Sequence, residues 1–269
     1  MRKTKKNILF FLVLCINTLV AQSNKVNPTN NMVLISGGVY IPLYGEKNND
    51  VKIKVSSFYI DKYPVTNAQF LEFVKGNPKW RRSNVKMLFA DKNYLSHWEN
   101  DLELGNNVLP NSPVTNISWF AAKAFCDYYG KRLPTVAEWE LVAKASANHP
   151  DGSKDQNFIK QILEWYSKPM DEKIPSVGLY GKNYWGVYNM HGLVWEWTSD
   201  FFSSLVTGES RGDSGLERNL FCGSGSVNAS DFKNYPAFMR FAFRSSLKAN
   251  YTTNNLGFRC TKDFNKKGN

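Results

Sequence analysis

The chain has 269 residues and a formal net charge of +11, with 34 Lys and Arg against 23 Asp and Glu. Apolar residues make up 42% and aromatic residues 14%, which excludes an intrinsically disordered chain. The length suits one large domain or two small ones, and it is sufficient to bury a real core. Long helical periodicity is missing, which excludes a helix bundle or a coiled coil.

The first residues are typical of an export signal. Residues 1–6 carry four basic side chains, residues 7–20 are mostly apolar, and Leu19-Val20-Ala21 resembles a signal peptidase site. The apolar run is shorter than the about 20 residues of a comfortable membrane span. The residues before Cys15 lack the small side chains of a lipidation site. We therefore expect residues 1–21 to be a signal peptide and the mature protein, without a membrane span, to be periplasmic or extracellular.

The basic charge indicates no specific partner. Four of the positive charges lie in the expected signal peptide, so the mature charge is about +7, that is +11 less 4. The remaining clusters are small, at residues 79–82 and 266–267. No basic stripe with interleaved stacking aromatics is present, so nucleic acid is not an expected partner. An acidic glycan or an anionic surface remains open.

The first half of the mature chain predicts short strands and then three helices. After a flexible lead-in at residues 22–31, strands are expected within residues 32–43 and 51–60. Thr66 with Gln69 forms a capping box that begins the first helix, which Gly76 and Pro78 end. The second helix is expected after the cap residue Ser118 and ends at Gly130; the third begins after Thr135, whose capping-box partner is Glu138.

The second half predicts loops and short apolar segments. Residues 146–185 are expected to be loop-rich, and the short apolar segments are residues 184–188, 194–197, 239–243 and 256–260. The expected class is α+β, with three short helices, short strands and long loops. Loops of more than about 15 residues need something to hold them in a compact domain. Tryptophan anchors, a disulfide and bound cations are the candidates.

Seven segments, in order, carry a resemblance to one known family: 32–38, 60–70, 113–126, 130–140, 186–192, 194–200 and 255–260. Over residues 32–262 the chain resembles the formylglycine-generating enzyme family, also called the sulfatase-modifying factor domain. The resemblance implies a fold related to C-type lectins, with little regular secondary structure and short antiparallel strands. Residues 263–269 are left as a basic tail.

Enzymes of that family oxidise a sulfatase cysteine to formylglycine with molecular oxygen, using Cu(I) held by two cysteines. Soft thiolates select Cu(I). In the family, two sequence segments flank these cysteines. Residues 224–227 and 240–244 of this chain match the two segments, but no residue from 223 to 259 is cysteine. Ala229 and Asn234 stand at about the positions of the two copper ligands. Copper is therefore not expected.

The resemblance also implies a groove at the site where family members bind their substrate. Five residues are candidates for binding or other chemistry in that groove: Cys222, Ser226, Trp195, Arg240 and Arg244. Cys222 is either a reactive thiol at the groove or a small buried apolar residue. The two arginines either hold an acidic or peptide ligand or pair internally with carboxylates. The three histidines show no spacing typical of a metal site; they are His97, His149 and His191.

The resemblance also implies two structural features. The first is a disulfide between Cys126 and Cys260. The second is a calcium site at Gly192, Val194 and Glu196, in which Leu193 replaces the asparagine of the family; hard oxygen ligands suit this ion. The alternative is that Glu196 pairs with an arginine.

The function favoured by these observations is that of an exported accessory or scaffold protein without oxidase activity. It would bind a peptide or protein partner; the resemblance suggests a periplasmic metalloenzyme or a secretion or gliding component. Two alternatives stay open. One is an enzyme of the same fold that uses Cys222 or another metal. The other is a lectin-like module that binds a glycan through the many Trp and Tyr side chains.

Overall fold

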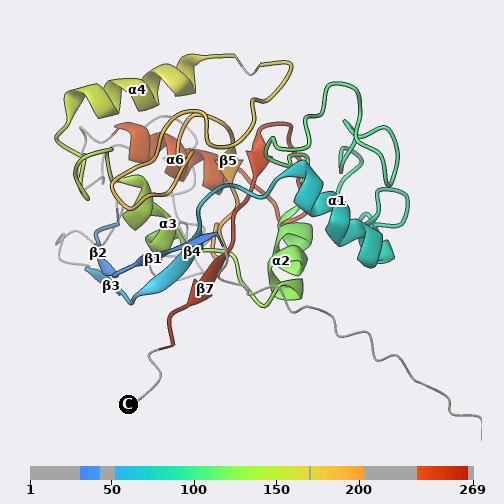
Figure 1. The fold of residues 1–269 in the computed structure, drawn as a ribbon, viewed down its shortest axis with the longest axis horizontal. Helices are drawn as coiled ribbons and strands as arrows, with labels where there is room; N and C mark the ends of the chain where they lie inside the picture. Colours follow the sequence, from blue (N-terminus) through green and yellow to red (C-terminus); the bar gives the residue numbers. More distant parts are fainter. Residues whose placement is uncertain (1–30, 43–51, 170, 203–234, 266–269) are drawn as a thin grey trace, which may run out of the picture.

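The computed structural model describes residues 31–42, 52–169, 171–202 and 235–265. Short strands and helices alternate with long loops along these residues (Figure 1). The strands are β1 (Met32–Ile35), β2 (Gly38–Tyr40), β3 (Ile53–Val55), β4 (Phe58–Asp61), β5 (Trp195–Glu196), β6 (Leu256–Gly257) and β7 (Thr261–Asp263). The helices are α1 (Asn67–Gly76), α2 (Trp119–Tyr128), α3 (Val136–Ala143), α4 (Gln156–Ser167) and α6 (Tyr235–Ser245), with a 3-10 turn at Pro78–Trp80. No helix in these ranges is long and apolar enough to span a bilayer.

The strands form three small sheets. The largest has the antiparallel order β1-β4-β7, so the last strand of the chain lies beside one of the first. β2 and β3 form an antiparallel pair, and β5 and β6 form a parallel pair. The predicted class of few short helices and short antiparallel strands is confirmed, and the parallel pair is an addition to it.

The three predicted helices form where their capping residues place them. Thr66 and Gln69 make a reciprocal capping box at α1, and Thr135 and Glu138 make one at α3. The Ser118 hydroxyl accepts a hydrogen bond from the Ala121 N–H at the start of α2. These side chains satisfy backbone N–H groups that have no partner within the helix.

Two further helices correct the expectation of three. α4 lies in the stretch that was expected to be loop, and Asp155 caps it by accepting from the N–H groups of Asn157 and Phe158. α6 contains residues 239–243, which were expected to be a short apolar segment between turns and not part of a helix. Its buried side chains are Pro236, Arg240 and Arg244. The face of α6 that packs inward therefore includes two arginines, which an apolar periodicity does not reveal.

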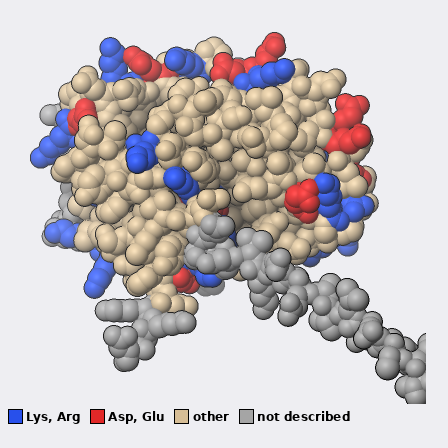
Figure 2. Space-filling model, in the orientation of Figure 1, with Lys and Arg blue, Asp and Glu red and all other residues tan. Residues whose placement is uncertain are grey.

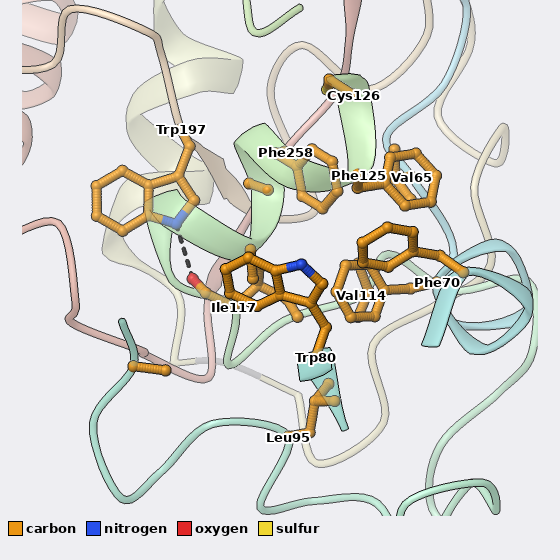
Figure 3. Packing of buried hydrophobic residues seen from close by; sticks show 14 of the residues in the cluster. Val65, Phe70, Trp80, Leu95, Val114, Ile117, Phe125, Cys126, Trp197 and Phe258 are labelled. Atoms are coloured by element: carbon orange, nitrogen blue, oxygen red, sulfur yellow. Dashed lines mark hydrogen bonds between the residues drawn. The ribbon is translucent and has the colours of Figure 1, made fainter. Parts of the chain in front are cut away.

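Two groups of buried apolar residues form the core. The larger lies between α1, α2 and the segment around β6, and aromatic rings fill much of it (Figure 3). Phe125 stacks on Phe70 and meets Phe258 edge to face. The Trp197 indole N–H donates to the Ile117 carbonyl at 2.8 Å, which anchors the loop before α2. The smaller group lies between α3 and the strands β1, β3 and β4.

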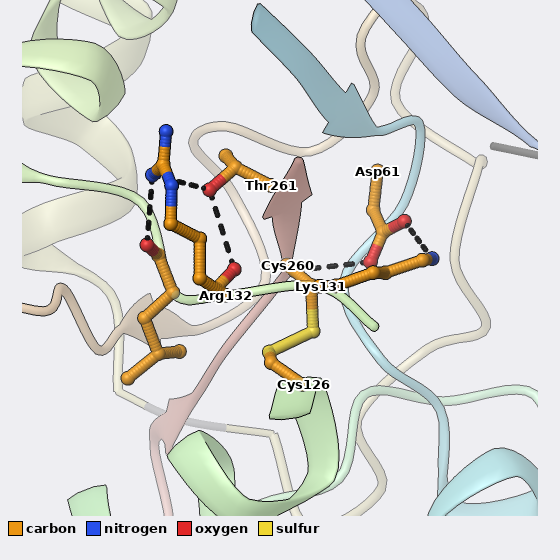
Figure 4. Close-up of a disulfide and its surroundings, with 7 residues drawn as sticks. Asp61, Cys126, Lys131, Arg132, Cys260 and Thr261 are labelled. Carbon is orange, nitrogen blue, oxygen red and sulfur yellow. Dashed lines mark hydrogen bonds and ion pairs between the residues drawn. A yellow bond between two sulfur atoms is a disulfide. The ribbon is translucent and has the colours of Figure 1, made fainter. Parts of the chain in front are cut away.

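A disulfide joins Cys126 of α2 to Cys260, which directly precedes β7, as predicted (Figure 4). The bond links positions 134 residues apart. Beside it, the Asp61 carboxylate accepts from the Cys260 N–H and pairs with Lys131 at 2.6 Å. The disulfide therefore lies at a junction of α2, β4 and β7.

Candidate functional site

Helices α3 and α6 are joined by a buried charge cluster. Glu140 of α3 pairs with Arg240 at 2.7 Å and with Arg244 at 2.6 Å. Both arginines come from one face of α6 because they are four residues apart. Burial alone would raise the pKa of Glu140, but the two guanidinium groups lower it to about 2. The Glu140 carboxylate is therefore ionised and fixed between the two helices.

A second buried ion pair lies near this cluster. Glu196 of β5 and Arg259 pair at 2.8 Å, and both side chains are fully buried. Trp139 connects the two pairs: its indole N–H donates to Glu196 at 2.7 Å, and the guanidinium group of Arg244 lies 4.8 Å from its ring centre. Three of the segments that carry the family resemblance, residues 130–140, 194–200 and 255–260, therefore meet in one charged and hydrogen-bonded network.

Aromatic rings cover the outer side of this network. Trp195 of β5 stacks on Tyr166 of α4 with ring centres 4.9 Å apart, and on Phe243 of α6 at 4.5 Å. The Tyr166 hydroxyl also accepts from Arg240 at 3.1 Å. α4 is thus held against α6 by both ring stacking and a hydrogen bond.

A pocket of about 670 Å³ opens between α4 and the segment that leads into β5. Five aromatic side chains line it, together with neutral polar groups and two charges of each sign. The aromatic members are Phe158, Trp165, Tyr166, Tyr180 and Trp195; the charged members are Glu164, Lys168, Asp171 and Lys182. The lining therefore combines aromatic side chains with polar groups and two charges of each sign. A concave site with aromatic walls and a few polar groups is a candidate ligand site.

Two pocket residues carry buried polar atoms that lack a hydrogen-bond partner among the described residues. They are Nδ2 of Asn189 and Nδ1 of His191. His191 Nε2 lies 3.0 Å from the Ala143 carbonyl. Because a carbonyl can only accept, this contact places the proton on Nε2 and leaves Nδ1 as an acceptor. Burial and the charge of Arg240 lower the pKa of His191 to about 3, which keeps the ring neutral.

The structure separates the five candidate groove residues. Trp195 lines the pocket. Arg240 and Arg244 are buried and paired with Glu140, which matches the alternative of internal pairing. Cys222 and Ser226 lie outside the described residues, as do Ala229 and Asn234 at the expected copper positions.

Neither metal implied by the resemblance finds a matching set of ligands. For copper, the chain offers no thiol from residue 223 to 259. For calcium, both oxygens of Glu196 accept from Arg259, and one also accepts from Trp139. Only the carbonyls of Gly192 and Val194 remain of the expected set. Within the described ranges, no three His, Cys, Asp or Glu side chains gather as metal ligands do.

Sequence reasoning missed the contribution of α4 to this site. The signal was present, because Asp155 caps a segment with apolar residues at 158, 159, 162, 165 and 166, which is a helical spacing. Asn189 and His191 carried no such signal, since neither has a partner at metal-ligand spacing. On the face shown in Figure 2, basic and acidic side chains are interspersed along the upper and right edges, whereas basic side chains predominate along the left edge.

Comparisons with known proteins agree with the sequence motifs. The family profile described as "Sulfatase-modifying factor enzyme 1-like domain" matches residues 17–264. The chain is 30% identical to the formylglycine-generating enzyme of Streptomyces coelicolor, with 78% of this chain and 80% of the relative covered. It is 27% identical to the "inactive C-alpha-formylglycine-generating enzyme 2" of Bos taurus, with 86% and 88% covered. Among solved structures, PvdO from Pseudomonas aeruginosa matches with 16% identity and a TM-score of 0.49, covering 89% of this chain and 97% of that one.

Proposed function

Because the chain belongs to the sulfatase-modifying factor enzyme 1-like domain family, we propose that it is an exported protein that binds a peptide segment of a partner in the pocket below α4 and does not oxidise it. The pocket lining carries this proposal. Its aromatic side chains offer contact area to an extended chain, and its charges nearly cancel. An exported metalloenzyme or a secretion component is the kind of partner that we infer.

The unpartnered polar atoms of the pocket residues support a peptide ligand. Asn189 Nδ2 is a donor and His191 Nδ1 is an acceptor, and both are buried. Both atoms are closed to solvent, and a buried polar atom without a partner costs free energy, so we expect the two side chains to turn toward a ligand that supplies the partner. A peptide group carries one acceptor and one donor, which is the complement of this pair.

The sequence supports binding without oxidation. Copper in this family needs two thiolates, and residues 223–259 contain none. The match to a relative that is named inactive is consistent with a member of the family that has another role. We expect no oxygen consumption when the protein is given a sulfatase peptide that contains cysteine. Turnover, or copper or iron retained in stoichiometric amount by elemental analysis, would favour the alternative of an enzyme.

Selection of peptides displayed on phage tests the pocket directly. Peptides recovered on the wild-type protein should bind the variants Tyr180→Ala and Ala147→Trp at least tenfold more weakly, because the first removes an aromatic wall and the second places a large ring at the pocket. Tyr128→Ala is the matched control, since Tyr128 on α2 is 57% exposed and Tyr180 is 59% exposed. Equal binding by all three variants would place the peptide elsewhere and contradict the proposal.

A glycan in the same pocket is the second candidate, because sugar rings also pack on exposed aromatic side chains such as Tyr180. A glycan array read with the same variants separates the two ligands. Binding of glycans that Ala147→Trp abolishes, with no peptide recovered, would replace the peptide proposal.

A further inference from the structure

The turn Lys86–Phe89 exposes three consecutive large apolar side chains. Met87 is 65% exposed, Leu88 is 73% exposed and Phe89 is 36% exposed. This turn lies in the stretch between the 3-10 turn and α2 and takes no part in the pocket. Single exposed apolar residues are common, but a run of three at one turn is unusual and often marks an interaction surface.

The turn is held in place by its own contacts. The N–H groups of Phe89 and Ala90 both donate to the Lys86 carbonyl, at 2.8 and 3.2 Å. The Phe89 ring contacts Trp80 below it at 6.1 Å and Phe120 of α2 at 5.4 Å. Met87 and Leu88 therefore project from an ordered frame.

Basic residues flank this turn in the sequence. Residues 79–92 contain five basic side chains and one acidic one; the basic ones are Lys79, Arg81, Arg82, Lys86 and Lys92. Lys79 lies over the ring of Trp80, which in turn contacts Phe89 of the turn, and the three lysines are all exposed. The two arginines are anchored: Arg81 donates to carbonyls at the end of α1, and Arg82 donates to the carbonyls of Leu95 and Trp98.

The acidic groups nearby are occupied. Asp91 accepts from the backbone and hydroxyl of Thr252 and from the Asn93 N–H. Asp101 accepts from the backbone and hydroxyl of Ser83, on the same side as the two arginines. Hydrogen bonds from neutral donors leave both carboxylates charged, but the five basic side chains of residues 79–92 outnumber them, so the net charge near the turn is positive.

We propose that the turn Lys86–Phe89 is a membrane contact, in which Met87 and Leu88 enter the interface of an anionic lipid bilayer while Lys79, Lys86 and Lys92 lie among the headgroups. Apolar side chains flanked by lysines are the combination that binds such interfaces, and both parts contribute to the affinity. The contact is peripheral. It would place the protein at a membrane surface with the pocket free to bind its partner.

Cosedimentation with vesicles tests the proposal. The protein is purified from the exported fraction with its N-terminus determined, so that the apolar N-terminal segment does not dominate binding. Vesicles of phosphatidylcholine with about a third of phosphatidylglycerol should bind it at low salt, and pure phosphatidylcholine vesicles should bind it much more weakly. Leu88→Ser should reduce the partition coefficient at least tenfold. Leu179→Ser is the matched control, since Leu179 is 64% exposed, and it should bind as the wild type does.

The charge is tested separately. Lys86→Glu should weaken binding to the anionic vesicles several-fold, whereas Lys160→Glu, at an exposed position on α4, should not. A tryptophan placed by Leu88→Trp should shift its emission to the blue when vesicles are added. No cosedimentation, an equal loss in both leucine variants, or an unshifted Leu88→Trp emission would overturn the proposal, and the apolar turn would then be assigned to a protein partner.

Discussion

Trp139 shows how single side chains set the position of the pocket wall. Its indole N–H is bonded to Glu196, one ring face lies against Arg244, and the His191 ring meets it edge to face at 5.9 Å. Each neighbour comes from a different segment of the chain. Trp139 therefore fixes the relative positions of α3, α6 and the loop that carries His191.

Removing the Glu140 charge should be strongly destabilising. Glu140→Gln keeps the size of the side chain but leaves Arg240 and Arg244 buried without a counterion. Breaking a buried ion pair by removing one partner costs about 3–5 kcal/mol. We expect a loss of that size in the free energy of unfolding, measured by urea titration. Glu72→Gln is the control: its pair with Lys75 is exposed and should contribute less than about 1 kcal/mol. Similar small losses in both variants would show that the cluster is not closed to water.

His191 should make the protein less stable in mild acid. Its pKa is about 3 in the folded protein and about 6.5 in the unfolded chain. Between these values the unfolded chain binds more protons, so falling pH favours unfolding. From pH 7.5 to 5.5 this effect amounts to about 1.4 kcal/mol.

The variant His191→Gln isolates that effect. Glutamine cannot take up the proton, so the free energy of unfolding should fall less between pH 7.5 and 5.5 than in the wild type. The exposed His149 gives a control, and His149→Gln should retain the full fall. A slope that is unchanged in His191→Gln would mean that the ring is solvated in the folded protein.

At the scale of elements, the sequence predicts a helix where capping and apolar periodicity agree. The capping boxes of α1 and α3 and the Ser118 cap of α2 are local, so they can be read without the fold. α6 could not be predicted in this way, because Arg240 and Arg244 occupy its buried positions and their partner Glu140 is 100 residues distant from Arg240. The pocket could not be predicted for a different reason: α4 carries a helical signal, but α4 and the loop that forms the other wall are brought together only by the fold.

The disulfide should be the main covalent support of α2 and β7. It closes a loop between positions 134 residues apart, and loop entropy gives a contribution of about 5 kcal/mol, with smaller values common in practice. Cys126→Ala with Cys260→Ala should lower the urea midpoint accordingly. A reducing agent should lower the midpoint of the wild type to that of the variant and leave the variant unchanged. A wild-type midpoint that does not respond to reduction would show that the bond contributes little.

At the scale of the whole molecule, the long loops are tied together by buried polar contacts. Arg259 donates to carbonyls of Asp61, Tyr188 and Asn189 as well as to Glu196. One arginine thus links β4, the loop before β5 and the end of the chain. In a fold with little regular structure, such a residue satisfies loop carbonyls that a sheet or helix would otherwise satisfy.

Calcium should therefore not be needed to hold the loops. The Glu196 carboxylate, which the ion would need, is already neutralised by Arg259. An ion held only by the carbonyls of Gly192 and Val194 would lack the charged ligand that calcium sites use. We expect excess chelator to change the melting temperature by less than about 1 °C, which for a domain of this size is well under 1 kcal/mol. The variant Arg259→Met tests whether the ion pair is what excludes calcium, because it leaves the Glu196 carboxylate without its counterion. The folded Arg259→Met protein should show a higher melting temperature when calcium is added. A fall of several degrees on chelation of the wild type, restored by calcium and not by magnesium, would show that the ion binds despite the ion pair.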